Sequence, residues 1–268
     1  MNHQESKLLL NECQSYLSKL GLGFVVKNAS PLTQGVNNTC IKVETMCENT
    51  LVIKHFDKQD NFKVTEVEKS LAKIKVVPKI VALNAEEKLI AYQFIEHKDF
   101  DKRLHLPFLV AKLKKLHQLK LEYDFDTINI EHTFNSFNDL QEFSDYQNDV
   151  IELIAKLRAC KPLIGVCHND LVIENLLFSL SDSWIIDCEY VGLNDVYFDL
   201  AALSSSLKLS EQDKNQLLSV YFEQSKISKK QLEKLNLYQQ VYNLICYFWY
   251  LKHGFKNHAL ALKPLIND

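Results

Sequence analysis

The segment 168–175, His-Asn-Asp-Leu-Val-Ile-Glu-Asn, has the pattern His-x-Asp-x-x-x-x-Asn, and Asp187 follows it after the apolar run 184–186. Phosphoryl transfer needs a carboxylate that orients the attacking hydroxyl and takes its proton. It also needs oxygen ligands for a Mg²⁺ ion on the nucleotide phosphates. The loop supplies one carboxylate, Asp170, and one amide, Asn175, while Asp187 supplies a second carboxylate. These residue types in this order favour a nucleotide-dependent phosphotransferase.

The signal is specific only when its parts are taken together. The pattern His-x-Asp-x-x-x-x-Asn alone occurs by chance, and a turn followed by a buried strand with incidental acids would give the same letters. Here the sequence continues with Ile-Asp-Cys-Glu-Tyr at 186–190 and with Asp-Leu-Ala at 199–201. The three segments in this order favour the functional interpretation.

Composition excludes several other classes of function. The 268 residues carry 31 Lys and Arg against 34 Asp and Glu, which gives a net charge of −3 and no global basic field for nucleic acid. The six glycines complete neither the GxxxxGK[ST] nor the GxGxxG phosphate-binding pattern. A Walker-type loop and a dinucleotide fingerprint are therefore excluded.

The cysteines and the apolar segments indicate the compartment. The seven cysteines include no CxxC pair, which favours reduced thiols over disulfides or a zinc site. The first residues lack the basic start and apolar run of a signal peptide. The longest strongly apolar stretch, 244–251, is about half of the ~20 residues that a membrane span needs. We therefore expect a cytoplasmic protein with no membrane partner and no nucleic-acid partner.

The hydrophobic periodicity divides the chain into two parts that must position these groups. The strand-like runs are 24–26, 51–56, 80–83, 89–95 and 184–187. The helix-like runs are 5–20, 61–74, 106–118, 138–159 and 231–255, with helices resuming from residue 196. Most of the strand-like runs precede residue 96 and most of the helical ones follow it. We therefore expect a small lobe over residues 1–95 and a larger helical lobe over residues 96–268.

The segments 167–178 and 185–203 resemble the choline/ethanolamine kinases of the aminoglycoside-phosphotransferase-like superfamily. The resemblance implies an α+β, two-lobed protein-kinase-like fold. Its small β-rich N-terminal lobe would clamp the nucleotide, and its larger C-terminal helical lobe would hold the catalytic and acceptor-binding groups. The resemblance also implies ATP and Mg²⁺ as cofactors.

The same resemblance assigns roles to the polar residues of the loop. It implies that Asp170 is the catalytic base and that Asn175 and Asp187 bind Mg²⁺. It implies that Asp199 braces the catalytic loop, and that His168 belongs to the scaffold of the loop rather than carrying a proton.

A glycine in the first lobe lies between two strand-like segments. The segment 32–39 resembles the nucleotide loop L-x-G-G-x-x-N of the family, which implies that Gly35 and Asn38 contact the nucleotide. A glycine there lets backbone N–H groups approach phosphate oxygens. Gln34 stands where the first glycine of the family pattern is usual, and a plain hairpin turn is the alternative.

Lys54 lies in the strand-like run 51–56, on the face that the period of two also gives to Val52 and Phe56. A buried ammonium group without a partner is costly, so Lys54 needs an anion. The family places at this position a lysine that touches the α- and β-phosphates of the nucleotide, and Lys54 matches it.

An acidic partner for Lys54 is expected from the helix-like run 61–74. Glu66 and Glu68 both qualify. At 100° per residue, Glu68 lies about 80° from the centre of the apolar stripe and Glu66 about 120°. We favour Glu68, and a solvated helix face is the alternative for whichever acid is not used.

The acceptor is indicated by aromatic and acidic residues, since a quaternary ammonium is held by aromatic faces and a carboxylate. Trp249 matches the first Trp of an aromatic helix that lines the choline pocket of choline kinases, and Lys252 occupies the position of the second. Glu189 and Tyr190 follow Asp187, with Glu189 expected on the same strand face as Asp187. Core packing is the alternative for most of these rings.

We therefore predict a kinase that transfers the γ-phosphate of ATP to choline or ethanolamine, a small and cationic alcohol. A kinase of thiamine, an aminoglycoside or a sugar is the first alternative. The acids of the helix-like run 138–152 would suit an aminoglycoside, although a solvated face explains them as well. A catalytically inactive, kinase-like binding module is the second alternative. Such a module would be expected to lack the base or a metal ligand, and all of these residues are present.

Overall fold

The computed structural model describes residues 3–34, 38–56, 62–120, 125 and 127–266. The chain packs into two compact units, the first formed by Met1–Phe100 with Leu177–Glu189 and the second by Asp101–Leu176 with Tyr190–Asp268. The lobes expected from the sequence were continuous stretches, whereas residues 177–189 pack with the first unit.

The first unit is built on a five-stranded antiparallel sheet with the order β1-β2-β3-β5-β4. Its elements are α1 (His3–Lys19), β1 (Val26–Gln34), β2 (Asn38–Thr45), β3 (Thr50–Phe56), α2 (Phe62–Lys73), β4 (Ile80–Asn84) and β5 (Leu89–Gln93). The hairpin β7 (Leu176–Phe178) and β8 (Ser183–Ile185) follows later in the chain. The helices expected before residue 96 are present and each expected strand overlaps an observed one, although β1 begins only at Val26 and β2 was not expected.

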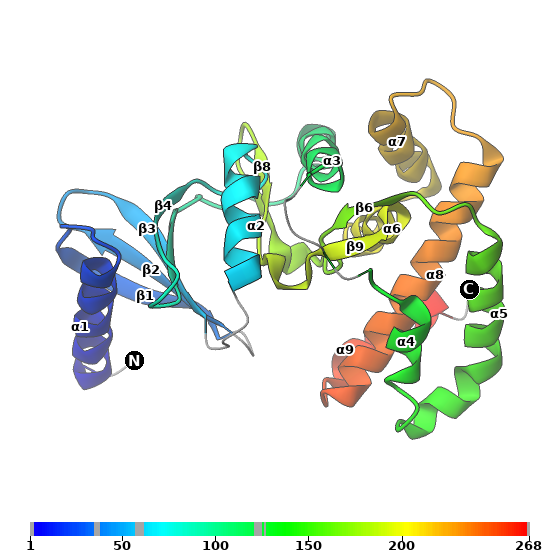
Figure 1. Ribbon diagram of the computed structural model, residues 1–268, viewed down its shortest axis with the longest axis horizontal. Helices are drawn as coiled ribbons and strands as arrows, with labels where there is room; N and C mark the ends of the chain where they lie inside the picture. The colour runs from blue at the N-terminus through cyan, green and yellow to red at the C-terminus, as the bar shows by residue number, and fades with distance from the viewer. Residues whose placement is uncertain (1–2, 35–37, 57–61, 121–124, 126, 267–268) are drawn as a thin grey trace. The chain divides into compact units, whose positions relative to one another are not determined.

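Alternation along β3 sends its side chains to two separate clusters. Leu51 and Ile53 join the cluster that α1 covers through Leu17, and Figure 1 shows α1 lying against the sheet. Phe56 belongs to a second cluster with Ile90. Since side chains of a strand alternate between faces, Lys54 shares the face of Phe56, as the sequence predicted.

The second unit is mainly helical. Its helices are α3 (Lys102–His117), α4 (Ile130–Asn135), α5 (Gln147–Ala159), α6 (Val196–Ser206), α7 (Glu211–Phe222), α8 (Lys229–Lys252) and α9 (Lys256–Ile266). The antiparallel strands β6 (Ile164–Cys167) and β9 (Gly192–Asp195) pair within it. In the described part of the chain, 3₁₀ turns form η1 (Gln141–Tyr146) and η2 (Ile173–Asn175) in this unit, while η3 (Cys188–Tyr190) begins in the first unit and ends in the second.

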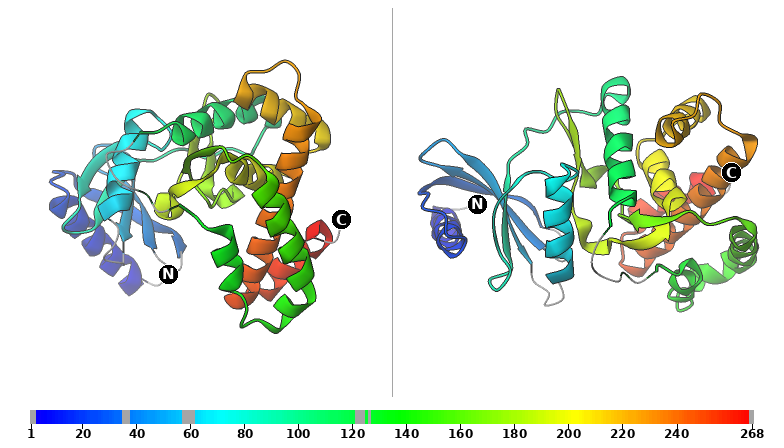
Figure 2. Two further views of the ribbon diagram at one scale, coloured as in Figure 1. Left: turned by 45° about the vertical axis from the view of Figure 1, so that its right-hand side comes forward. Right: turned by 45° about the horizontal axis from the view of Figure 1, so that its top comes forward.

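The helix α6 forms the centre of this unit, since every residue from Val196 to Ser204 is buried. The long helix α8, orange in Figure 2, packs against α6, α5 and α9. No helix among the described residues is long and apolar enough to cross a membrane.

Two expected elements differ from those observed. The helix expected over 138–159 is divided, because η1 is a 3₁₀ turn and the α-helix begins only at Gln147. The strand expected over 184–187 ends at Ile185, and Asp187 has a φ of 65°. A strand residue has a negative φ, so the alternation of faces does not extend to Glu189.

Candidate active site

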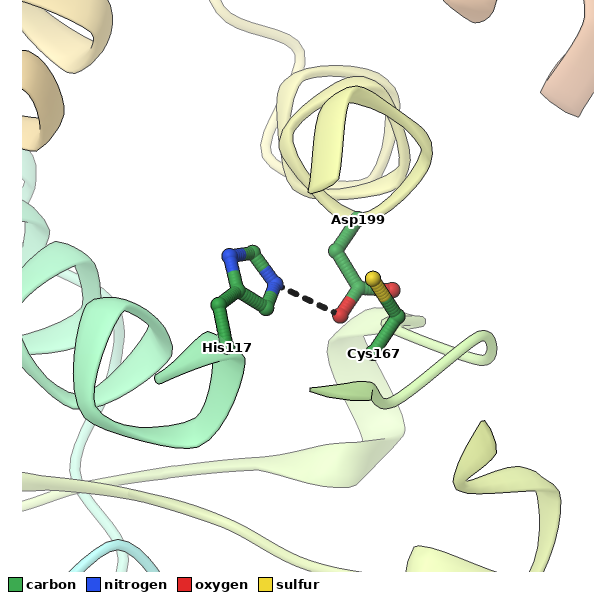
Figure 3. Close-up of side chains that lie close together, drawn as sticks. All are labelled: His117, Cys167 and Asp199. Carbon is green, nitrogen blue, oxygen red and sulfur yellow. Dashed lines mark hydrogen bonds and ion pairs between the residues drawn. The ribbon is translucent and has the colours of Figure 1, made fainter. Parts of the chain in front are cut away.

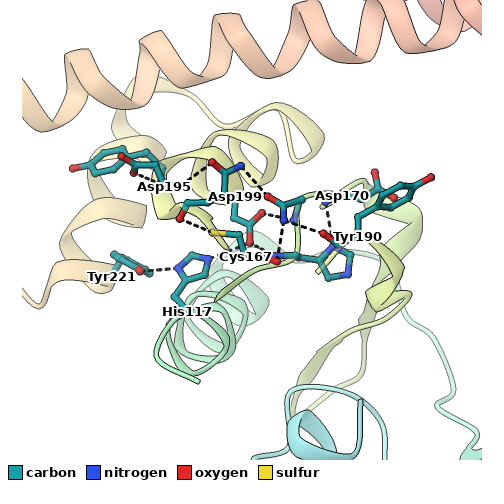
Figure 4. A network of polar contacts seen from close by, with 11 residues as sticks. His117, Cys167, Asp170, Tyr190, Asp195, Asp199 and Tyr221 are labelled. Atoms are coloured by element: carbon teal, nitrogen blue, oxygen red, sulfur yellow. Dashed lines mark hydrogen bonds and ion pairs between the residues drawn. The ribbon is translucent and has the colours of Figure 1, made fainter. Parts of the chain in front are cut away.

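The loop after β6 is fixed by the side chain of Asn169. Its backbone has a φ of 65°, a conformation in which Asn is enriched. Its amide nitrogen donates to the carbonyl oxygens of Tyr190 at 2.9 Å and Cys167 at 3.2 Å, and its oxygen accepts from Asn194 at 2.9 Å. These contacts, part of the network in Figure 4, tie the loop to the end of β6, to Tyr190 and to β9.

Asp199 of α6 holds the backbone immediately before Asp170. Its fully buried carboxylate accepts the backbone N–H of His168 at 2.6 Å and that of Asn169 at 2.8 Å. Hydrogen bonds to a charged acceptor are stronger than neutral ones, and burial strengthens them further. The bracing role implied for Asp199 is therefore confirmed as a structural contact.

Within the loop, Asp170 and Asn175 contact each other. The amide nitrogen of Asn175 donates to the carbonyl oxygen of Asp170 at 2.9 Å and to its Oδ2 at 3.0 Å. The backbone N–H of Asp170 donates to Nδ1 of His168 at 3.3 Å. Because both His168 and Asn175 are buried, the Asp170 carboxylate is attached to a loop with little freedom to rearrange.

The first unit places Lys54 against Asp187. The ammonium of Lys54 lies 2.6 Å from Oδ1 of Asp187 and 5.0 Å from the centre of the Phe56 ring. Lys54 is only 5% exposed. Burial opposes its charged form, but Glu68 and Asp187 outweigh that effect and raise the pKa of Lys54 above its ordinary value. The anion that a buried lysine requires is present.

Of the two acids considered on α2, Glu68 is the one near Lys54. Glu68 is 2% exposed and accepts the backbone N–H of Cys188, while its Oε2 has no hydrogen-bond partner among the described residues. Burial raises the pKa of Glu68 to about 7, although Lys54 acts to lower it. Glu66 instead pairs with Lys69 one turn away. The observed ion pair of Lys54, however, is with Asp187.

The remaining predicted nucleotide residues fall at the edge of the described chain. Gly35 lies outside the described residues. The backbone of Asn38 begins β2 and pairs with Phe56 in the register of the sheet, but its side chain is outside the description.

Glu189 and Tyr190 lie in η3 rather than on a strand. Glu189 is in the first unit and raises the pKa of Glu68 through its charge, as a minor contribution after burial. Tyr190 belongs to the second unit and is 46% exposed, and its carbonyl accepts from Asn169. The expectation that Glu189 shares a strand face with Asp187 is therefore wrong, because the strand has already ended.

Trp249 lies on α8, half-buried, with its ring stacked on that of His253 at a centroid distance of 4.1 Å. The ring of Phe255 is parallel to it within 5°, at 6.0 Å. Lys252 turns its ammonium to the carbonyl of Ser136 and to Asp139, where Oδ1 lies at 3.2 Å. The charge of Lys252 is therefore paired at the C-terminal end of α8.

Tyr242 is a further residue of α8 that sequence reasoning missed. Burial raises the pKa of the phenols of Tyr242 and Tyr250, and the charge of Asp170 adds to the effect. At 100° per residue Trp249 lies about 20° from Tyr242, whereas Tyr250 lies about 80° from Tyr242 and about 100° from Trp249. Tyr242 and Trp249 therefore share a face of α8, and Tyr250 lies beside it.

A compact group of His117, Cys167 and Asp199 has side chains of the types that bind metals (Figure 3). Both oxygens of Asp199 already accept backbone N–H groups, and the Cys167 thiol donates to the carbonyl of Asn194 at 3.5 Å. Burial raises the pKa of Cys167 well above its ordinary value, whereas a metal requires the thiolate. The group fits a hydrogen-bonded support for the loop better than a metal site.

Comparison with known proteins adds a family and a fold. The model of the phosphotransferase enzyme family matches residues 28–228. Protein LicA of Haemophilus influenzae is 35% identical over 111 residues, which cover 38% of this chain and 42% of LicA. The match thus spans less than half the length of that relative.

Two solved structures share the fold over nearly the whole chain. A choline/ethanolamine kinase family protein from Mesorhizobium loti has a TM-score of 0.79 and 18% identity, covering 97% of this chain and 94% of its own. Choline kinase LicA from Streptococcus pneumoniae has a TM-score of 0.75 and 20% identity, covering 96% of each chain. These similarities confirm the predicted α+β, protein-kinase-like fold class.

Proposed function

Because the chain belongs to the phosphotransferase enzyme family, we propose that it is a kinase that transfers the γ-phosphate of ATP to the hydroxyl of choline or ethanolamine. The observation that carries the proposal is the frame around Asp170, in which a buried carboxylate holds the backbone and Asn175 holds the side chain. The names of the similar proteins support the choice of acceptor.

Asp170 is the proposed catalytic base. Its carboxylate would orient the acceptor hydroxyl and take its proton as the bond to phosphorus forms. Because phosphoryl transfer passes through a loose transition state, the base acts mainly by orientation and late proton transfer. The amide hydrogen bond from Asn175 at 3.0 Å keeps one carboxylate oxygen directed, which suits this role.

Lys54 is the proposed contact to the nucleotide phosphates, and Glu68 its supporting acid. The ion pair with Asp187 holds the ammonium of Lys54 in place until phosphate replaces the carboxylate. Gly35 and Asn38 are proposed to contribute the nucleotide loop.

Asn175 and Asp187 offer the hard oxygen ligands that suit Mg²⁺. The amide nitrogen of Asn175 is committed to Asp170, which leaves its oxygen as the ligand atom, and the Asp187 side chain is 36% exposed. When bound, Mg²⁺ would neutralise charge on the phosphates. The acceptor is proposed to contact Trp249, Tyr190 and Glu189.

The direct test is ADP release by the wild-type protein with ATP and Mg²⁺ over a panel of choline, ethanolamine, thiamine, an aminoglycoside and a simple sugar. We expect release above the acceptor-free rate with choline or ethanolamine. Release that depends only on another panel member would overturn the acceptor, and no acceptor-dependent release at all would overturn the kinase proposal.

Two neighbouring substitutions test the base. Asp170→Asn keeps the shape of the side chain and is expected to lower kcat on the order of 10²–10⁴-fold with little change in Mg·ATP affinity. Glu174→Gln is the matched control, since Glu174 is an exposed acid of the same loop. Near-wild-type kcat in a folded Asp170→Asn protein would contradict the assignment.

A further inference from the structure

A chain of hydrogen bonds runs from α7 through α3 to α6 and ends on the loop that carries Asp170 (Figure 4). The hydroxyl of Tyr221 lies 2.7 Å from Nδ1 of His117, and Nε2 of His117 lies 3.1 Å from Oδ2 of Asp199. All three residues are buried. The same Oδ2 accepts the backbone N–H of His168 at 2.6 Å.

The donors and acceptors along this chain select one tautomer of His117. The carboxylate of Asp199 only accepts, so the nitrogen that faces it must carry the proton. With the proton on Nε2, Nδ1 accepts and the phenol of Tyr221 is its donor. Burial raises the pKa of Tyr221 above its ordinary value, which keeps the proton on the phenol. The opposite tautomer would direct a nitrogen lone pair at a carboxylate oxygen.

We propose that Tyr221 is a positioning residue that, by donating to Nδ1, holds the His117 ring where its Nε2–H donates to Asp199, and thereby fixes the orientation of the carboxylate that holds the Asp170 loop. The inference rests on the proposed function, because Asp170 is the group whose position matters. Tyr221 would act through two intermediate side chains and contact no substrate.

The backbone provides an independent reason why His117 lies where it does. Gly165 of β6 faces the end of α3, and a Cβ atom at that position would lie 2.7 Å from the carbonyl oxygen of His117 and 3.3 Å from its Cβ. Only a glycine allows this approach without displacement. The strand that leads into the loop and the helix that carries His117 are therefore in direct contact.

The carboxylate of Asp199 has its two oxygens in different contacts. Oδ1 accepts from Asn169, while Oδ2 accepts from His168 and from His117. A rotation of the carboxylate that lost the His117 contact would also disturb the backbone contacts. Through this coupling, a change at Tyr221 can alter the hydrogen bonds that hold the backbone of the loop.

The tautomer is measured directly by ¹⁵N NMR of the protein labelled at histidine, with the His117 signals assigned by their loss in His117→Gln. We expect Nε2 protonated and Nδ1 unprotonated in the wild type, and a shifted Nδ1 resonance in Tyr221→Phe, because Nδ1 loses its hydrogen-bond donor. Tyr238→Phe is the matched control, because it removes another buried phenol that bonds to Asp195, outside this chain of contacts. An Nδ1–H tautomer in the wild type, or unchanged His117 ring resonances in Tyr221→Phe, would overturn the proposal.

Kinetics give the second measurement. Tyr221→Phe is expected to lower kcat on the order of tenfold, less than the ~10²-fold that a 1 Å misplacement costs, with KM for ATP unchanged. In the His117→Gln background the imidazole that links Tyr221 to Asp199 is absent, so Tyr221→Phe should have no further effect on kcat. An equal loss in both backgrounds would refute a route through His117. Failure of the proposed function is distinguishable, since it would remove acceptor-dependent activity from the wild type and leave the NMR result intact.

Discussion

Replacement of Asp199 by asparagine should destabilise the second unit by a measurable amount, because it removes one acceptor from a site with three donors. The amide oxygen is expected to occupy the Oδ2 position, where the His168 N–H at 2.6 Å and His117 Nε2 at 3.1 Å both point. The new NH₂ group then faces the N–H of Asn169, which loses the acceptor that it now has at 2.8 Å.

The expected magnitude follows from these contacts. A buried donor left without a partner costs about 1–3 kcal/mol. The hydrogen bonds from His168 and His117 weaken because their acceptor becomes neutral. The unfavourable burial of the Asp199 charge is relieved at the same time. The net loss in free energy of unfolding is expected to be about 2–3 kcal/mol.

Urea unfolding followed by tryptophan fluorescence can isolate the unit concerned. The chain has two tryptophans, Trp184 in the first unit and Trp249 in the second, so a Trp184→Phe background leaves Trp249 as the reporter. Asp139→Asn is the control. Asp139 is exposed and pairs with Lys252, so its loss should stay within about 0.5 kcal/mol. For Asp199→Asn, a loss in free energy of unfolding of less than about 0.5 kcal/mol would refute the reasoning.

Three further predictions concern packing, protonation and thiol reactivity. Gly165→Ala should lower the free energy of unfolding by about 1–3 kcal/mol, since its Cβ would meet a backbone carbonyl at 2.7 Å, whereas Gly23→Ala, with open space, should stay within about 0.5 kcal/mol. In the native state Glu68 keeps its proton up to a pH of about 7, whereas in the unfolded chain it loses the proton near pH 4.5. As pH rises through that window, the free energy of unfolding of the wild type should fall by up to roughly 3 kcal/mol relative to that of Glu68→Gln, as measured by urea unfolding. Parallel pH profiles of the two proteins would contradict this prediction. At pH 8, mass spectrometry after iodoacetamide should find exposed Cys47 alkylated before buried Cys13, whose pKa burial raises to about 12, and equal rates would contradict it.

Periodicity predicted most of the long helices, part of the first sheet and the face of Lys54, because these depend on local geometry. Alternation along β3 separates Ile53 from Phe56, and the structure places these two side chains in different clusters. The same rule failed at Asp187, where a φ of 65° ends the strand. That conformation accompanies an ion pair with Lys54, distant in sequence, and no local pattern encodes such a partner.

The contacts that hold the loop were out of reach of sequence reasoning for the same reason. His117 and Tyr221 are 104 residues apart in the sequence. The sequence around each of them shows only a position in an amphipathic helix. Asp199 was identified from a family resemblance, which carries information that periodicity lacks. By contrast, the spacing of Tyr242 and Trp249 was visible in the sequence and places both rings on one face of α8, but the relation of Tyr242 to Asp170 is not encoded locally.

The two groups of proposed catalytic residues are held by different forces. The Asp170 loop depends on a carboxylate that is fully buried and bonded to backbone N–H groups, so salt does not screen it. The ion pair of Lys54 includes Asp187, whose side chain is 36% exposed, and water and salt reach it. A base must keep one orientation through the reaction, whereas a phosphate-binding lysine must exchange its carboxylate partner for the nucleotide. The rigid frame therefore suits Asp170, and the exchangeable pair suits Lys54.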